Sequence, residues 1–350
     1  MRVDIEDLER RAAAVLPGFV YDYFRATAGS PQVLLDQIAA WDAIRHRPRI
    51  LRDTSAPDTS TSVLGIPVRT PVMLAPMAQQ VAASPGGEAD MAAAAAAAGT
   101  VIGVSTNTAV RFAEIASAGA PWWFQLYVMR DRSITDALLE RALAAEARAL
   151  VLTVDVTGLA HPSAASTVSI EPDEWGDAPA AARLVNLSDG ERERARGDGG
   201  RIARDLGFDA IRWLRERTDL PVVVKGVLRA DDARHAVDAG AAAVVVSTHG
   251  GRGLSSAVSS AVALAEVVDA VEGRAEVYAD SGIRSGLHVA SALALGARAV
   301  FIGRPAMWGL AVDGAAGARD VLDAFTEDLV RSMNLLGAPG IPDLTRDLIA

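Results

Sequence analysis

The stretch 221-PVVVKGVLRADDARHAVDAGAAAVVVSTHGGRG-253 decides the fold of this chain. Two short apolar runs, 221–227 and 244–247, are rich in the β-branched residue valine, and residues 231–240 between them have helical spacing. Gly240 ends that helix as a natural cap. This order predicts a strand, a crossover helix and a second, parallel strand. Both strands end in polar residues, and the carboxyl ends of such strands are where ligands bind.

Lys225, at the end of the first run, is the only lysine of the chain: of the 34 Lys and Arg residues, one is lysine and 33 are arginine. A composition that otherwise uses only arginine indicates that this position needs a compact cation. Two interpretations are open, a lysine that reaches solvent from a strand end and a functional cation in a site. We favour the functional one, because a buried charge is costly without a partner.

Length, composition and charge narrow the class of protein. A chain of 350 residues, half of them hydrophobic, has room for two ordinary domains or for one α/β barrel. The net charge of −10 argues against nucleic acid as a partner. The absence of cysteine excludes disulfides and thiolate chemistry, and we predict no metal. The charged first residues and the short alanine run 92–98 predict a cytoplasmic protein with no membrane partner.

The strand and helix pattern of the central stretch repeats along the chain. Runs of buried parallel type are expected at 72–76, 101–105, 122–127, 150–155, 222–225, 244–247, 277–280 and 300–303. Helical segments separate them at 88–98, 112–118, 134–147, 210–217, 231–239, 262–271 and 287–295, and a long helix is expected at 315–336. Eight strands joined by helices predict an α/β fold of the (β/α)8 TIM barrel type.

The chain reads as a single barrel domain, 1–350, with two additions. Residues 1–70 form an N-terminal extension that is mostly helical over 3–43 and has a short hairpin at 61–68. Residues 157–207, after the fourth strand, are rich in Asp, Arg, Gly and Pro and are too long for an ordinary connection. We interpret 157–207 as a lid insertion over the barrel mouth; a plain disordered insertion is the alternative.

Polar side chains stand where the apolar strands end. The first six strand ends supply Met77, Ala78, Ser105, Thr106, Gln125, Tyr127, Thr153, Asp155, Lys225, Ser247 and His249. The last two supply Asp280, Ser281, Gly282, Arg284, Gly303 and Arg304. Glycine lets backbone N–H groups approach a phosphate, and the loops after strands seven and eight of a barrel commonly hold one. The sequence therefore predicts a phosphate-bearing ligand, either a phosphosugar or flavin mononucleotide (FMN).

Four of these side chains favour the flavin, because they offer several hydrogen bonds to a flat heteroaromatic ring: Ser105, Gln125, Thr153 and Lys225. A cation beside such a ring would also stabilise its reduced, anionic form.

At these residues the chain resembles the family of FMN-dependent 2-hydroxy-acid oxidases and dehydrogenases, which includes glycolate oxidase, lactate oxidase and mandelate-oxidising enzymes. The resemblance covers nearly the whole chain. It rests on Ala75-Pro76-Met77-Ala78, Phe124-Gln125-Leu126-Tyr127, Leu152-Thr153-Val154-Asp155, Val224-Lys225-Gly226, Ser247-Thr248-His249-Gly250-Gly251-Arg252 and Phe301-Ile302-Gly303-Arg304-Pro305. It implies FMN as the cofactor, oxidation of a 2-hydroxy acid to the 2-oxo acid, and a homotetramer.

The resemblance also implies a role for each site residue. His249 would be the base, Asp155 would hold its ring, Arg252 would bind the substrate carboxylate, and Tyr23 and Tyr127 would contact the substrate. The cofactor set would be Ala75, Pro76, Met77, Ala78, Ser105, Gln125, Thr153, Lys225, Ser247, Asp280, Ser281, Gly282, Arg284, Gly303 and Arg304.

The substrate end departs from the family pattern while the flavin end matches it. Pro162 stands where similar enzymes carry a second substrate arginine, and Thr248 replaces the asparagine before the catalytic histidine. Asn107 stands where an aromatic residue is common, and Gly253-Leu254-Ser255 replaces Gln-Leu-Asp. Loss of one of two arginines predicts weak use of small free acids.

Three functions remain open on the sequence. The first is oxidation of a 2-hydroxy acid, with a bulky or aryl group favoured, and the second is oxidation of a related substrate without a simple free carboxylate in specialised metabolism. The third is a flavin-binding scaffold that has lost catalysis. The retained His249, Asp155 and Arg252 argue against the scaffold.

Overall fold

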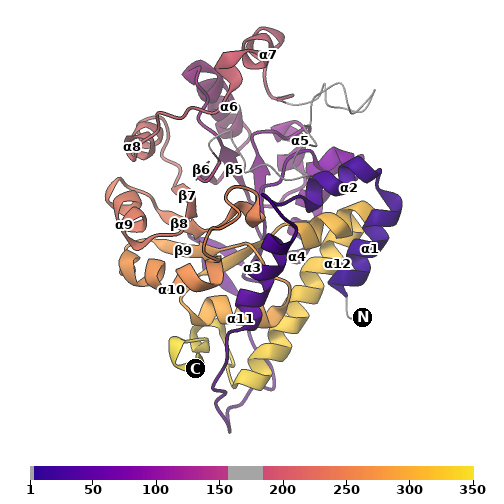
Figure 1. Ribbon diagram of the computed structural model, residues 1–350, viewed down its shortest axis with the longest axis vertical. Helices are drawn as coiled ribbons and strands as arrows, with labels where there is room; N and C mark the ends of the chain where they lie inside the picture. Colours follow the sequence, from indigo (N-terminus) through magenta and orange to yellow (C-terminus); the bar gives the residue numbers. More distant parts are fainter. Residues whose placement is uncertain (1–3, 157–183) are drawn as a thin grey trace.

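Short valine-, isoleucine- and leucine-rich runs form eight strands that are almost entirely buried, as parallel strands covered on both faces must be. In the computed structural model, which describes residues 4–156 and 184–350, these strands close into one parallel barrel (Figure 1). They are β3 (Val72–Leu74), β4 (Ile102–Ser105), β5 (Trp122–Leu126), β6 (Ala149–Thr153), β7 (Val222–Val227), β8 (Ala243–Val246), β9 (Glu276–Ala279) and β10 (Ala299–Ile302). Neighbours follow the chain order, and β10 closes against β3. The predicted (β/α)8 barrel is confirmed.

Helices separate the strands and cover the outside of the barrel (Figure 1). They are α4 (Gly87–Ala98), α5 (Phe112–Ser117), α6 (Arg132–Ala144), α8 (Asp209–Arg215), α9 (Ala230–Asp238), α10 (Ser260–Val271), α11 (Gly286–Ala294) and α12 (Arg304–Leu336). The helix expected at 315–336 is the second part of α12, which begins much earlier, directly after β10. Non-helical backbone at Asp313 and Gly314 divides the two parts.

Two apolar layers hold the barrel together. Inside it, the rings of Trp123, Tyr278 and Phe301 pack edge to face or tilted, with centroids 5.5 to 6.0 Å apart. Outside it, the opposite faces of the same strands pack against the helices in one continuous cluster. Because both faces of every strand are covered, polar residues remain only at the strand ends, where they can form a site.

The N-terminal extension wraps one side of the barrel (Figure 1). It contains α1 (Ile5–Val15), α2 (Gly18–Arg25), α3 (Gln32–Asp42) and the antiparallel pair β1 (Thr61–Val63) and β2 (Ile66–Val68), as expected. Helix α1 packs on α12, and α3 packs on α10 and α11. The extension therefore lies against the loops that carry the predicted site.

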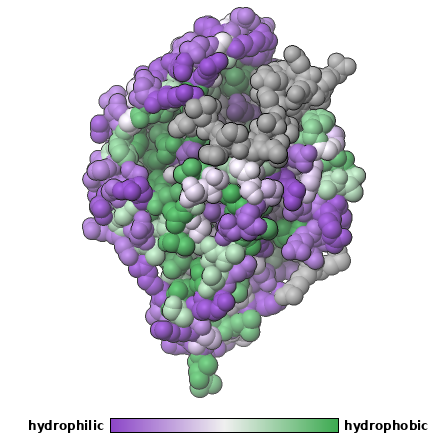
Figure 2. Space-filling view, in the orientation of Figure 1, coloured by the Kyte–Doolittle hydropathy of each residue, from purple (hydrophilic) through white to green (hydrophobic). Residues whose placement is uncertain are grey.

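The segment 184–207 contains α7 (Asp189–Arg196) and the short turn η4 (Asp198–Gly200), and hydrophilic residues cover the α7 end of the molecule (Figure 2). Met129 and Ile202 form a bridge, and Arg130 pairs with Asp198 at 2.6 Å. Part of the predicted insertion is therefore ordered against the loop after β5. Residues 157–183 lie outside the described residues, so the lid stays a prediction. No helix in the described ranges is long and apolar enough to cross a lipid bilayer.

We expect Gly286→Ala to lower the free energy of unfolding by about 1–3 kcal/mol, as overpacking does. Gly286 begins α11, its N–H donates to Asp328 at 2.7 Å, and a Cβ there would overlap the backbone of Asp328 and Leu329 in α12. Gly190→Ala in α7 is the matched control, because no atom lies within 4 Å of its new Cβ. Chemical denaturation of both variants tests this; equal stability would show that α11 and α12 do not pack this closely.

Candidate active site

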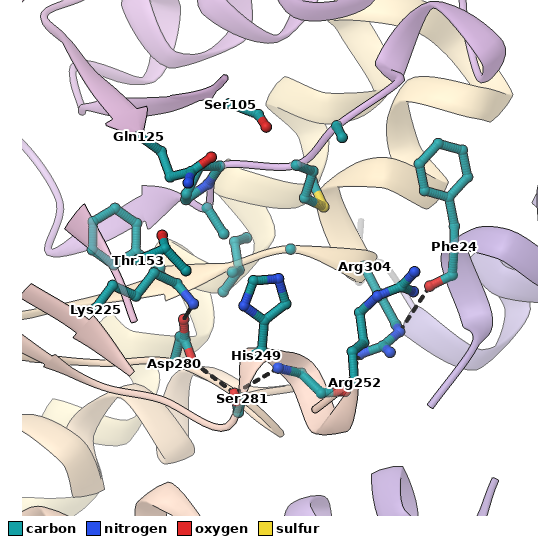
Figure 3. A pocket seen from close by; sticks show the side chains of 18 of the residues that line it. Phe24, Ser105, Gln125, Thr153, Lys225, His249, Arg252, Asp280, Ser281 and Arg304 are labelled. Atoms are coloured by element: carbon teal, nitrogen blue, oxygen red, sulfur yellow. Dashed lines mark hydrogen bonds and ion pairs between the residues drawn. The ribbon is translucent and has the colours of Figure 1, made fainter. Parts of the chain in front are cut away.

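A cavity of about 420 Å3 opens at the carboxyl ends of the barrel strands, and nearly all predicted site residues line it (Figure 3). They are Tyr23, Ala75, Pro76, Met77, Ala78, Ser105, Gln125, Tyr127, Thr153, Lys225, His249, Arg252, Asp280, Ser281, Gly282, Arg284, Gly303 and Arg304. The remaining two stand directly behind the lining: Asp155 contacts His249 and Ser247 contacts Lys225. The topology thus brings together residues from every strand end.

Lys225, in β7, is 4% exposed and lies among acceptors. Its Nζ donates to Ser247 Oγ at 2.8 Å and pairs with Asp280 Oδ2 at 3.2 Å and Asp155 Oδ2 at 3.9 Å. Burial opposes its charge, but the two carboxylates outweigh burial and raise the pKa of Lys225. The ammonium is therefore a permanent cation at the cavity wall.

His249 and Asp155 form a hydrogen-bonded pair at the cavity. Nδ1 of His249 lies 2.9 Å from Asp155 Oδ1. Burial alone would raise the pKa of Asp155, but His249 and Lys225 hold it below its ordinary value. An ionised carboxylate only accepts, so Nδ1 carries the proton and Nε2 keeps the lone pair. The pair can therefore take up a proton at Nε2.

One end of the cavity has polar atoms that no described residue satisfies. Gln125 Nε2 and Thr153 Oγ1 are fully buried and have no protein partner there. Gln125 Oε1 accepts from Thr106 N at 3.3 Å, which orients the amide with its donor unpaired. Buried polar groups in folded proteins are normally hydrogen-bonded, so these atoms indicate a ligand with both donors and acceptors. Ser105, Gln125 and Thr153 stand near one another around this end (Figure 3).

The other end carries three guanidinium groups, Arg252, Arg284 and Arg304, which donate to backbone carbonyl oxygens of the described residues. Burial lowers the pKa of Arg304 to about 9, assisted by the two neighbouring arginines, and lowers that of Arg284 to about 10. Mutual repulsion of buried cations favours an anion between them. This end suits a phosphate or a carboxylate.

The N-terminal extension supplies part of the same wall. Arg304 donates to the backbone oxygens of Phe24 at 3.0 Å and Ala26 at 2.8 Å, and Arg252 donates to that of Tyr23 at 2.7 Å. Arg252 also lies 5.0 Å from the centre of the Tyr23 ring. The predictions assigned these arginines to ligands only; in this structure they also hold the end of α2 against the barrel.

Further residues of the cavity were not predicted: Phe24, Ala26, Thr27, Val156, Gly250, Ile283, Phe301 and Ile302. Most adjoin a predicted residue in the chain, so sequence proximity to Tyr23 or Arg284 was an available signal. Tyr127 was predicted, and burial, with Asp155 next, raises its pKa, so it is a neutral hydroxyl. Pro162 lies outside the described residues. Within the described ranges no three His, Asp or Glu side chains are grouped to hold a metal.

Three comparisons relate this chain to known proteins. A family described as "FMN-dependent dehydrogenase" matches residues 12–350. L-lactate oxidase of Nostoc sp. is 40% identical over 98% of this chain and 96% of its own, and the peroxisomal (S)-2-hydroxyacid oxidase of Arabidopsis thaliana is 38% identical over 99% and 95%. A crystal structure of an arginine-to-leucine variant of mandelate oxidase with 2-hydroxy-phenylacetamide has a TM-score of 0.88 at 36% identity, covering 99% and 98% of the two chains.

We expect Lys225→Met to lower the free energy of unfolding by about 3–5 kcal/mol at pH 7, because it leaves Asp155 and Asp280 buried without their cation. Lys225 has a raised folded pKa, so its contribution is complete below its unfolded pKa of about 10.4 and is lost as the pH rises through the folded value. Asp155 has a lowered folded pKa, so its contribution is present above its unfolded pKa of about 3.9 and is lost as the pH falls.

The deficit of the Lys225→Met variant should therefore shrink as the pH falls below about 5, where Asp155 and Asp280, left without the Lys225 cation, become protonated. Denaturant titrations at several pH values measure it. Arg229→Met, which breaks the exposed pair with Asp231, is the control and should change stability little. A deficit that does not vary with pH would contradict the buried-pair account.

Proposed function

This chain belongs to the FMN-dependent dehydrogenase family and uses FMN to oxidise a 2-hydroxy acid to the 2-oxo acid; we propose that its preferred substrate carries a bulky or aryl group. The observation that supports this most is one cavity holding a proton acceptor, His249 with Asp155, beside the buried cation Lys225 and the carboxylate-binding candidate Arg252. The proton acceptor and the buried cation suit the oxidation of a carbinol, and Arg252 suits the recognition of a carboxylate.

The residues present fit FMN. The unsatisfied Gln125 Nε2 and Thr153 Oγ1 match the carbonyl and ring-nitrogen pattern of an isoalloxazine, and the cationic end matches a phosphate. We propose that Ser105, Gln125, Thr153, Lys225 and the 75–78 segment hold the ring, and that Asp280, Gly282, Arg284, Gly303 and Arg304 hold the ribityl chain and phosphate. FMN, when bound, supplies the two-electron acceptor for the oxidation.

The protein's own side chains accept the proton, orient the substrate and place a positive charge beside the ring. His249 Nε2 accepts the proton that the carbinol group gives up, while Asp155 stabilises the resulting imidazolium. Arg252 orients the carboxylate, since its Nη1 is fixed by the backbone oxygens of Tyr23 and Ala26 at 2.7 and 3.2 Å. Tyr23 and Tyr127 would contact the substrate hydroxyl or carboxylate. Lys225 places its positive charge beside the ring that receives the electrons.

The preference for a bulkier substrate rests on the altered substrate end. Asn107 and Val156 line the cavity with small neutral groups, and Pro162, at the family's second arginine, has neither charge nor donor. A small acid has little other surface with which to recover the lost charge-assisted binding, whereas an aryl group buries apolar area. A substrate without a free carboxylate is the second candidate, favoured by the similar mandelate oxidase variant that holds an amide.

Location and assembly remain proposals. We propose a cytoplasmic protein that assembles as a homotetramer, from the charge pattern of the sequence and the family resemblance. One similar relative is named peroxisomal, so cell fractionation is the test of location, and light scattering of the purified protein is the test of assembly.

We expect Arg284→Leu to weaken FMN binding roughly 10- to 150-fold, the value of one hydrogen bond to a charged group. Riboflavin, which lacks the phosphate, should bind the variant and the original protein equally. Arg331→Leu is the control for loss of an arginine. Arg331 lines a second, separate pocket of the protein and pairs with Asp328 at 3.1 Å, so this variant should bind FMN and riboflavin as the original protein does. Fluorescence titration of the three proteins, stripped of cofactor, measures the six dissociation constants for FMN and riboflavin. Equal losses for FMN and riboflavin would remove Arg284 from the phosphate.

We expect kcat/KM for mandelate to exceed that for lactate by at least about tenfold, since burying roughly 100 Å2 of phenyl surface is worth up to about 2.5 kcal/mol. Mandelamide tests the second candidate and should keep measurable activity.

We expect His249→Ala to lower kcat/KM about 10²–10⁴-fold on every substrate, because a positioned general base contributes that much, while FMN stays bound.

Two outcomes would contradict this proposal. Lactate as the best of the three substrates would show that the altered substrate end does not redirect specificity. A Pro162→Arg variant that gains nothing on lactate would show that position 162 does not face the substrate.

A further inference from the structure

Ser281 holds an unusual backbone conformation beside the candidate base. Its φ of 68° lies in the left-handed region, which a residue with a Cβ rarely adopts, and the residue is 8% exposed. Such strain persists only where surrounding interactions determine it, and it often marks a functional position. The resemblance assigned Ser281 to the cofactor, but its hydrogen bonds point elsewhere.

The hydroxyl of Ser281 joins two loops. It donates to Asp280 Oδ1 at 2.6 Å and accepts from the N–H groups of Thr248 at 3.2 Å and Gly250 at 3.0 Å. A hydroxyl has one donor and two acceptor positions, so this group is fully used. These two N–H groups belong to the residues on either side of His249. Figure 3 shows the contact between Asp280 and Ser281 below the His249 ring.

His249 is itself in a strained turn, η5 (His249–Gly251), with φ of 55°. Its own N–H donates to Ser247 Oγ at 3.0 Å, and that oxygen also receives Lys225 Nζ at 2.8 Å. Three consecutive N–H groups of this turn are thus held by two serine hydroxyls. The orientation of the imidazole therefore depends on both serines as well as on Asp155.

The contacts close a ring. It runs from His249 to Asp155, on to Lys225 and Asp280, and through Ser281 Oγ back to the His249 turn, with links of 2.9, 3.9, 3.2, 2.6 and 3.0 Å. The link through Ser281 Oγ ties the backbone on either side of His249 to Asp280, the carboxylate nearer to Lys225 Nζ. Low local dielectric makes such connected polar groups mutually supporting.

We propose that Ser281 is a positioning residue, whose hydroxyl holds the His249 turn so that the base and the Lys225 cation face the same reacting group. The proposal rests on the proposed function and deepens it. Misplacement of a reacting group by about 1 Å costs roughly 100-fold in rate. Loss of the hydroxyl should therefore slow the chemical step and leave binding intact.

The loop keeps its backbone anchors without this hydroxyl. The carbonyl oxygen of Ser281 accepts from Trp41 Nε1 at 2.9 Å, and the Ser260 hydroxyl donates to the carbonyl oxygen of Asp280 at 2.5 Å. Removing only the hydroxyl therefore leaves the path of the loop supported, and the variants below are expected to fold.

Two variants separate the hydroxyl from the backbone conformation. Ser281→Ala removes the hydroxyl and keeps the left-handed strain, whereas Ser281→Gly removes both. The rate of flavin reduction by mandelate, measured anaerobically on the holoenzyme, should fall roughly 10- to 100-fold in both variants. The dissociation constants of mandelate and FMN should stay within about threefold. A residue that merely fills the turn would be replaced by glycine without loss.

A second measurement does not depend on activity. The side-chain ¹⁵N signals of His249 in histidine-labelled holoenzyme, assigned with His249→Gln, should shift or broaden in both Ser281 variants. Ser291→Ala is the matched control, because Ser291 is also a buried serine and its Oγ lies 3.0 Å from His46 Nε2. It should move the signals of His46, leave those of His249 unchanged and not alter the rate.

The reduction rate and the histidine signals together distinguish failure of the proposed function from failure of the positioning role of Ser281. If mandelate and the other hydroxy acids fail to reduce the flavin of the original protein, the proposed function fails while the histidine signals still test Ser281. A Ser281→Gly variant with the original reduction rate, or with unchanged His249 signals, overturns the positioning role. Slowed reduction with intact binding and shifted His249 signals supports it.

Discussion

The buried ammonium of Lys225 is the group on which the rest of the site depends. It lies between the carboxylates of Asp280 and Asp155 and beside Ser247, with only 6% of its side chain exposed. Each carboxylate has a second partner: Asp155 pairs with His249, in the loop after β8, and Asp280 accepts from the adjacent Ser281. One charge thus connects β7 with the loops after β6, β8 and β9. A buried ion pair is not in itself a large source of stability, but loss of one member leaves the others uncompensated.

The N-terminal extension is hydrogen-bonded to residues of the barrel site. Arg304 and Arg252 arise after β10 and β8, yet both donate to backbone oxygens at the end of α2. These arginines have two roles, since they support the extension and also form the cationic end of the cavity. The end of α2 and the cationic end of the cavity are therefore built from the same guanidinium groups.

The two ends of the cavity differ in charge, and each end suits a different part of a ligand. The end with unsatisfied polar atoms, Gln125 Nε2 and Thr153 Oγ1, suits a flat ring, and the end with Arg284 and Arg304 suits a phosphate. His249 and Lys225 line this same cavity. The substrate end is less charged than the family pattern, and specificity is a difference between affinities, so small neutral changes there can redirect the choice of acid.

The sequence by itself determined the barrel and which residues stand at the carboxyl ends of its strands. Valine-rich runs separated by helical segments predict eight parallel strands, and a closed parallel barrel places every strand's carboxyl end at one rim. Hence Lys225, His249 and Asp280, far apart in the chain, could be predicted to lie close together, and in the structure they line one cavity. Only the tertiary structure decided their partners. The bonds of Ser281 Oγ to the His249 turn and of Arg304 to Phe24 O join residues from different loops, across 280 positions in the second case. Such contacts depend on loop dihedral angles and rotamers that packing selects, and no periodicity in the sequence encodes them.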